Sequence, residues 1–273
     1  MSKAFGIVNF AGNHIQVDGL QAYRPVGAFS FLGRYRTIDF PISNMSNSGI
    51  DNIQVYVRRK PRSLTEHLGT GRHYNINSKR GQLNIMYTEN NRIGDIYSTD
   101  VAAYIENMNC IERIHLPYVV VAPSYMIYTA DYSTFLSEHI ESGADISMMY
   151  HSVDNAKEAF LNCGTLNINK QKGVLSIEPN HGNAKNKNIS LDTYVMSKEL
   201  FIDLVKKAHK TSSMYTFADI LNEECENLDI RAVSHRGYFA AICDFNSYYH
   251  ANMDLIDLKH ASDLFDPSWP IYT

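Results

Sequence analysis

The chain has 273 residues, a formal net charge of −4 and 44% hydrophobic residues. This length allows one large or two modest domains, and the weak negative charge excludes a general attraction to nucleic acids or anionic membranes. No apolar run approaches the ~20 residues of a membrane-spanning helix, and four scattered cysteines without a CxxC pair argue against a zinc site or a disulfide framework. We therefore expect a cytoplasmic protein without membrane or nucleic-acid partners.

The first 150 residues alternate short apolar runs with amphipathic segments. This alternation predicts strands over 4–10, 51–57, 117–122 and 146–153, and helices over 41–48, 100–114 and 131–145. Strands that alternate with helices of this length indicate βαβ units and a mostly parallel sheet. Ser63, followed by Glu66 three residues later, is typical of a capping box and predicts that another helix starts there.

The pattern changes from about residue 159. A β-hairpin is predicted around 170–173, then a strand and a helix over 189–210, a helix over 216–228, two strands within 230–245 and a last helix over 246–258. The Asn-rich stretch 178–188 is typical of an exposed loop. The fold class is α/β, with the second half as a mixed extension of the same sheet.

The most specific motif runs from Arg24 to Ile53 and reads RPVGAFSFLGRYRTIDFPISNMSNSGIDNI. It resembles the sugar-1-phosphate nucleotidyltransferases, and among them the ADP-glucose pyrophosphorylase (glucose-1-phosphate adenylyltransferase) family. SLTEHL, DYSTFLSEHIESGAD, YYHANMDLIDL and LFDPSWPIYT extend the resemblance over nearly the whole chain. The resemblance implies a Rossmann-like, GT-A-like domain over 1–258, with a mixed, mostly parallel central sheet flanked by helices. It also implies that 259–273 is a linker toward a β-helix domain that this chain lacks.

The residues that the family's chemistry requires are different here. Adenylyl transfer to a sugar phosphate needs amides around the triphosphate, a cation on the phosphates and carboxylates that hold Mg²⁺. Gly12 is a remnant of the family's G-G-x-G-x-R-L nucleotide loop, which here lacks its arginine, and Val26 replaces the lysine of R-A-K-P. Tyr125 and Ala241 stand at the positions of the two metal-binding aspartates. A phenol and a methyl group cannot replace anionic ligands of a hard cation, so we expect no metal site and no catalytic residue.

The sugar-phosphate side of the implied site also differs from the family. Glu178 remains from the F-V-E-K-P motif, but the lysine that would pair with the phosphate is missing. Ser190 and Tyr194 match sugar-pocket positions, and the glycine between them is Asp192. These three matching residues are remnants of the sugar-phosphate pocket, and Asp192 is expected to repel an anionic phosphate.

Two groups of arginines are candidates for an anionic effector site. One is Arg34 with Arg36 in GRYR, and the other is the basic run RRKPR over 58–62. Charge runs are usually solvated, so Arg34 is the stronger candidate. Asp39, in TIDF, is interpreted as a cap of the following helix or loop rather than as a catalytic acid.

Within the family the chain looks most like the GlgD-type subunit, which is a non-catalytic or barely catalytic partner of a catalytic homologue. The resemblance predicts a regulatory subunit, a pseudoenzyme in a hetero-oligomer that makes ADP-glucose and pyrophosphate from ATP and glucose 1-phosphate for glycogen biosynthesis. Two alternatives stay open. One is an active adenylyltransferase in which Asp244 or Asp131 holds Mg²⁺, and the other is a stand-alone sensor of a nucleotide or sugar phosphate.

Overall fold

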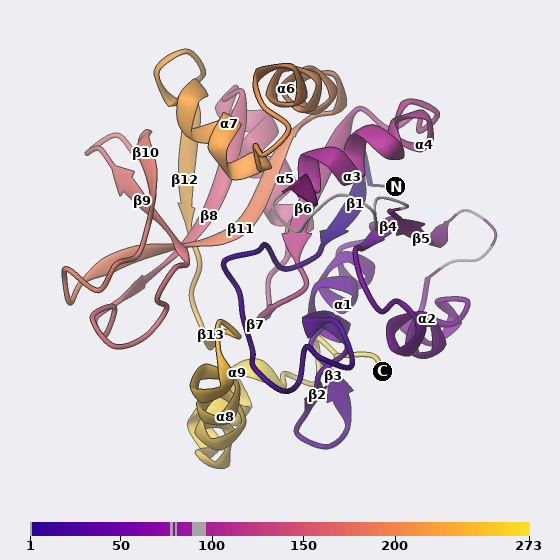
Figure 1. Cartoon of the computed structure of the whole chain (residues 1–273), viewed down its shortest axis with the longest axis vertical. Coiled ribbons are helices and arrows are strands. Elements are labelled where there is room, and N and C mark those ends of the chain that lie inside the picture. Colours follow the sequence, from indigo (N-terminus) through magenta and orange to yellow (C-terminus); the bar gives the residue numbers. More distant parts are fainter. Residues whose placement is uncertain (1, 77–78, 80, 89–96) are drawn as a thin grey trace.

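The computed structural model describes residues 2–76, 79, 81–88 and 97–273. These residues form a central sheet with helices on both faces (Figure 1). Its strands are β1 (Ala4–Asn9), β4 (Asn52–Val57), β5 (Gln82–Tyr87), β6 (Tyr118–Pro123), β8 (Ile146–Val153), β9 (Gly164–Ile168), β10 (Val174–Pro179), β11 (Lys187–Ser197) and β12 (Ile230–Ser234).

The order of the strands is β10-β9-β11-β6-β1-β4-β5, with β8 paired to β11 and β12 paired to β8. The pairings orient β1, β4, β5, β6, β8, β9 and β12 in one direction, and β10 and β11 in the other. The sheet is therefore mixed and mostly parallel, and the predicted fold class is confirmed.

Two small sheets and the helices surround this sheet. The small sheets pair β2 (Ser30–Phe31) with β3 (Tyr35–Arg36), and β7 (Met126–Tyr128) with β13 (Phe239–Ala241). The α-helices are α1 (Asp39–Asn47), α2 (Arg62–Leu68), α3 (Asp100–Glu106), α4 (Met108–Glu112), α5 (Tyr132–Ser142), α6 (Lys198–Thr211), α7 (Phe217–Glu223), α8 (Phe245–Met253) and α9 (Leu258–Leu264). Among the described residues, no helix is both long and apolar enough to span a membrane.

Strand β1 divides the hydrophobic interior into two cores. Phe5 and Ile7 pack with side chains of α3, α6 and α7, whereas Ala4 and Val8 pack with side chains of α1 and α5 on the other face. A parallel strand that is buried on both faces has a nearly continuous apolar sequence. This is why the sequence pattern of β1 was sufficient to predict it.

The predicted capping box at Ser63 is wrong. Helix α2 begins one residue earlier, at Arg62, and the N-cap position is Pro61, which has no side-chain cap. Glu66 pairs with Arg62 one turn away, at 2.8 Å, instead of reaching back to the helix start. A proline preset to a helical φ can start the helix without the capping hydrogen bonds.

Two further elements differ from the prediction. The single helix expected over 100–114 is two helices, α3 and α4, which are separated at Asn107. The side-chain amide of Asn107 donates to the carbonyl of Ala103 at 3.0 Å, and such local bonds compete with helix continuation. Strand β5 was not predicted because it lies at the sheet edge and only Met86 among its side chains is buried.

The last residues of the chain pack against α1. Trp269 Nε1 donates to Asn44 Oδ1 at 3.0 Å, and the backbone N–H of Tyr272 donates to Ser43 Oγ at 2.9 Å. The segment 259–273, expected as a linker, thus contains most of α9 and a stretch bound to α1. Its role as a linker toward a further domain stays a prediction.

Candidate functional site

The carboxyl ends of β1, β4 and β6 lie at one edge of the sheet, where open α/β sheets bind ligands. A cavity of about 400 Å³ lies there. Its walls are the loop after β1 (residues 10–16), the segment 24–27 and the chain directly after β4 (residues 58–60). Gly12 lines this cavity, so the structure places the expected nucleotide-loop remnant at a ligand-sized hollow.

The loop after β1 is held down on the core. Ile15 and Val17 are buried within the first hydrophobic core. The backbone N–H of Gln16 donates to the carbonyl of Cys243 at 3.2 Å, and that of Val17 donates to Gln21 Oε1 at 2.8 Å. These contacts use two of the backbone amides that a phosphate-binding loop would direct at its ligand.

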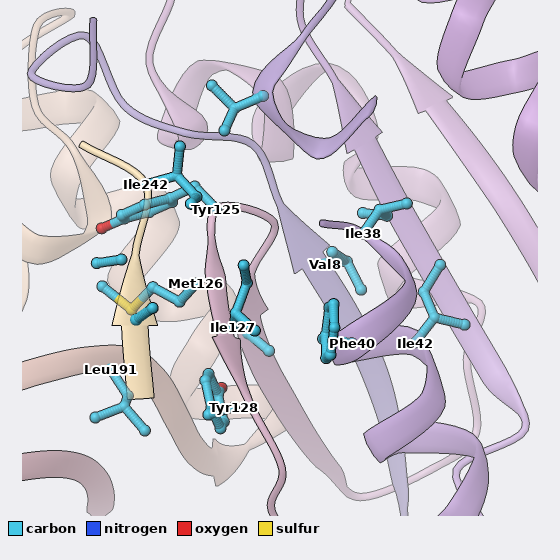
Figure 2. Close-up of a cluster of buried hydrophobic side chains, with 14 of the residues drawn as sticks. Val8, Ile38, Phe40, Ile42, Tyr125, Met126, Ile127, Tyr128, Leu191 and Ile242 are labelled. Carbon is cyan, nitrogen blue, oxygen red and sulfur yellow. The ribbon is translucent and has the colours of Figure 1, made fainter. Parts of the chain in front are cut away.

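Tyr125 lies between β6 and β7 and is only 2% exposed. Its hydroxyl donates to Asp192 Oδ2 at 2.5 Å, while the hydroxyl of Tyr194 donates to Oδ1 of the same carboxylate at 3.3 Å. Burial, together with the neighbouring Asp192, raises the pKa of the Tyr125 phenol well above its ordinary value. Tyr125 is therefore a neutral hydrogen-bond donor at physiological pH, and Figure 2 shows its ring beside Ile242.

Asp192 has a backbone conformation that favours glycine. Its φ is +46°, and its N–H donates to Ser190 Oγ at 3.0 Å. Aspartate is one of the few residues with a side chain that enters the left-handed region with a modest penalty. The motif comparison implies a glycine at this position, so the carboxylate that Tyr125 binds is an addition. Two of the replacements noted in the sequence therefore contact each other.

Ala241 also lies next to Tyr125. Ala241 pairs with Met126 between β13 and β7, and the N–H of Ile242 donates to the carbonyl of Tyr125 at 2.9 Å. The structure thus brings together the two positions at which the resemblance implies metal-binding aspartates. Within the described part of the chain, no three His, Cys, Asp or Glu side chains are grouped so that they could hold a metal ion.

The other two aspartates considered for Mg²⁺ are helix N-caps. Asp131 Oδ1 accepts the N–H of Ser133 at 2.8 Å at the start of α5. Asp244 Oδ1 accepts the N–H of Ser247 at 2.7 Å and forms a capping box at the start of α8. Each of these carboxylates already stabilises the first turn of a helix.

The remaining sequence-predicted residues lie apart from this cluster. The Glu178 carboxylate accepts from Asn167 Nδ2 at 3.1 Å and from Ser176 Oγ at 3.0 Å on the β9–β10 hairpin. Arg36 donates to the carbonyl of Ala28 at 2.9 Å, which is a structural contact. Arg34 is exposed, with its guanidinium 5.5 Å from the ring centre of Tyr35. Asp192 thus forms hydrogen bonds with Ser190, Tyr194 and Tyr125, whereas Glu178 bonds to side chains of its own hairpin.

Two cysteines near Tyr125 were not expected to meet. The sulfur atoms of Cys163 and Cys243 are 3.1 Å apart, and both residues are buried free thiols. The hydrogen bond to Cys243, followed by burial, raises the pKa of the Cys163 thiol. Spacing along the chain held no signal for this pair, because 80 residues separate its members.

The contact between Tyr125 and Asp192 predicts a measurable coupling. Tyr125→Phe should lower the free energy of unfolding by about 1–3 kcal/mol, because the half-buried carboxylate of Asp192 loses a donor. Asp192→Gly relieves the left-handed backbone but leaves the Tyr125 phenol without its acceptor. In a double-mutant cycle followed by urea unfolding, the two changes should show a coupling of about 1–2 kcal/mol. The exposed Tyr249→Phe is the control, and strict additivity of the pair would contradict the contact.

The fold and the site together define a class of protein. A mostly parallel α/β sheet with a ligand-sized cavity at the carboxyl ends of its strands has the architecture of a nucleotide-handling transferase domain. Residues 12–257 match the family model described as Nucleotidyl transferase, and the chain belongs to this family.

Comparisons with individual proteins agree with this membership. The chain is 30% identical over 253 residues to the glucose-1-phosphate adenylyltransferase of Clostridioides difficile (strain 630), a match that covers 90% of this chain and 64% of that protein. It is 26% identical over 278 residues to the glycogen biosynthesis protein GlgD of Geobacillus stearothermophilus, covering 100% of this chain and 69% of that one. The chain thus spans about two thirds of the length of these relatives.

A solved structure supports the fold. The chain superposes on a Bacillus anthracis protein assigned as a glucose-1-phosphate thymidylyltransferase with a TM-score of 0.73 and 15% sequence identity. The match covers 93% of this chain and 96% of the other. At this identity, the likeness concerns the fold.

Proposed function

We propose that the chain is a non-catalytic or weakly catalytic regulatory subunit of a glucose-1-phosphate adenylyltransferase, which assembles in the cytoplasm with a catalytic homologue. The complex would convert ATP and glucose 1-phosphate to ADP-glucose and pyrophosphate in bacterial glycogen biosynthesis. Membership of the nucleotidyltransferase family and similarity to an adenylyltransferase and to a GlgD protein support the pathway and the reaction. An anionic effector at Arg34 or Arg36 belongs to the same proposal.

The observation that carries the regulatory role is the hydrogen bond between Tyr125 and Asp192. The phenol stands where the resemblance implies an acid, and it uses one oxygen of the carboxylate while Tyr194 uses the other. Ala241 stands at the position of the second implied metal-binding aspartate. A hard cation at this edge of the sheet would therefore meet the carboxylate of Asp192, whose oxygens already accept hydrogen bonds. The same carboxylate would repel the phosphate of a sugar phosphate.

The active-enzyme alternative needs Mg²⁺ on Asp244 or Asp131. Both carboxylates cap helices, α8 and α5, and no described His, Cys, Asp or Glu pair stands with either of them to complete a metal site. The residues therefore do not fit a resident Mg²⁺, which makes the regulatory proposal the better supported one.

A mixing experiment tests the proposal. Pyrophosphate release from ATP and glucose 1-phosphate is measured with the 273-residue chain alone, with a catalytic homologue alone, and with both. We expect background turnover from the chain alone, and a change of at least about twofold in the homologue's turnover or activator response on mixing, an effect on the scale of a typical allosteric coupling.

The contradicting outcome is robust turnover by the chain alone that is lost in Asp244→Asn. Asparagine caps a helix about as well as aspartate, so this variant removes a ligand for a hard cation while it preserves the start of α8. An unchanged rate and activator response on mixing would instead favour the stand-alone sensor.

A further inference from the structure

The cavity at the carboxyl edge of the sheet has an unusual charge. Arg58, Arg59 and Lys60, directly after β4, line one wall, and Arg24 lies on another. Among the described residues that line the cavity, none is an aspartate or a glutamate. The neutral polar side chains of Asn13, Gln16, Gln21 and Ser124 complete the polar part of the lining.

The contacts of Arg58 do not neutralise its charge. Its guanidinium donates to the carbonyl of Ser98 at 3.0 Å and to the side-chain oxygen of Asn13, which are both uncharged acceptors. It also lies 5.6 Å from the ring centre of Phe10. Burial and, second, the neighbouring Arg59 lower the pKa of Arg58. A positive charge that is partly removed from water and sits beside another cation is stabilised by an anion.

Lys60 contributes a second charge with neutral partners. Its ammonium donates to the carbonyl of Gln21 at 3.3 Å and to that of Ala22. These bonds fasten residues 21 and 22 to the end of β4, whereas the bond from Arg58 to Asn13 fastens the loop after β1. The chain after β4 therefore holds these segments in place and also supplies positive charge to the cavity.

The source of this charge differs from the family motif. The motif would place cations on the nucleotide loop and at position 26, where this chain has a loop without its arginine and Val26. Arg24 keeps the motif's arginine, and the other cations that line the cavity, Arg58, Arg59 and Lys60, come from a different element, the end of β4. Positive charge is thus present at this edge although the loop arginine, the motif's lysine and the implied metal ligands are replaced.

We propose that this cavity binds a small phosphorylated anion without a divalent cation, and that Arg58 and Lys60 supply the charge that holds it. A volume of about 400 Å³ suits a small molecule, and Phe10 and Tyr56 give an apolar wall for the part of the ligand that carries the phosphate. The inference rests on the proposed function in treating this pocket as a regulatory site. The group that the cavity recognises is the phosphate, which a nucleotide, a sugar phosphate and pyrophosphate share.

Isothermal titration of the isolated 273-residue chain tests the inference. Pyrophosphate, glucose 1-phosphate and ATP are titrated separately in buffer with EDTA, and then with Mg²⁺. At least one probe should bind in EDTA, and Mg²⁺ should not be required. Comparison of the three probes shows which carrier of the phosphate the cavity prefers.

Variants then locate the site. Arg58→Gln and Lys60→Gln should each weaken binding by about tenfold or more, because each removes a charge-assisted hydrogen bond. Arg113→Gln changes an exposed arginine outside the cavity and is the matched control, which should leave the affinity unchanged. Melting temperatures monitor folding, and Lys60→Gln decides the question if Arg58→Gln loosens the loop.

Three results would overturn the inference: no binding of any probe in EDTA, binding that appears only with Mg²⁺, or an Arg113→Gln variant that loses as much affinity as Arg58→Gln. The titration contains no catalytic homologue. A negative titration therefore leaves the mixing experiment open, and a failed mixing experiment leaves the titration result standing.

Discussion

Replacing Asp39 with alanine is expected to lower the free energy of unfolding by about 3–5 kcal/mol. The Asp39 carboxylate is fully buried and accepts three hydrogen bonds, from His67 Nε2 at 2.6 Å, from the Tyr74 hydroxyl at 2.5 Å and from the N–H of Arg36 at 2.8 Å. Alanine would leave all three donors in the interior without an acceptor. Urea unfolding followed by circular dichroism measures the loss.

Two further variants accompany this prediction, one as a milder change in the same network and one as a control. Tyr74→Phe removes one of the three donors and should cost about 1–3 kcal/mol, which keeps the test informative if Asp39→Ala does not fold. Asp203→Ala changes an exposed aspartate on α6 and should stay within about 0.5 kcal/mol of the parent. A loss below about 1 kcal/mol in Asp39→Ala would show that the network adds little to stability.

Replacing Asp100 with asparagine is expected to stabilise the protein by roughly 2 kcal/mol at pH 8. Burial raises the pKa of Asp100 to about 6, and the hydrogen bonds from Phe217, Val101 and Asn9 only partly oppose this rise. Asn9 Nδ2 now donates to Asp100 Oδ2 at 3.0 Å, and Asn9 Oδ1 is a buried acceptor without a donor. A rotation of the Asn9 side-chain amide by 180° would present Oδ1 to the new amide of Asp100→Asn.

The sign of the pH dependence follows from the raised pKa of Asp100. The folded chain holds this proton more tightly than the unfolded chain, whose aspartate has its ordinary pKa of 3.8. The stabilising contribution of the protonated form is therefore complete below about pH 4 and is lost as the pH rises through 6. The advantage of Asp100→Asn should thus fall to roughly half at pH 5.

Unfolding in urea at pH 5 and pH 8 measures this dependence for the parent chain and the variant. The exposed Asp263→Asn on α9 serves as the control and should show no such pH-dependent difference. An advantage of Asp100→Asn that is the same at both pH values would mean that Asp100 does not titrate in this range.

The sequence was sufficient to predict those parts of the fold whose signal is local. Continuous apolar runs such as 4–10 and 117–122 marked the buried parallel strands β1 and β6. Helical spacing over 131–145 marked α5, which ends where Gly143 adopts a φ of +66° after the last helical residue. Strand β5 was not predicted because an edge strand buries little apolar surface. The capping box predicted at Ser63 was wrong because Pro61 sets the start of α2.

The site could be predicted only one residue at a time. Motif positions identified Tyr125, Ala241 and Asp192 as separate departures from the family, and the structure places all three around one point. The contact between Tyr125 and Asp192 joins residues 67 positions apart. No local pattern encodes such a pairing, because it depends on how β6 and β11 lie side by side in the sheet.

The pairing of Tyr125 with Asp192 also limits which changes of sequence the protein can tolerate one at a time. Tyr125→Asp alone would set a buried carboxylate beside the half-buried one of Asp192, and Asp192→Gly alone would leave the buried Tyr125 hydroxyl without its acceptor. Either change made alone is thus expected to give a less stable chain. Tyr125→Asp made together with Asp192→Gly would avoid the pair of neighbouring carboxylates, so the two positions are expected to tolerate change better together than one at a time.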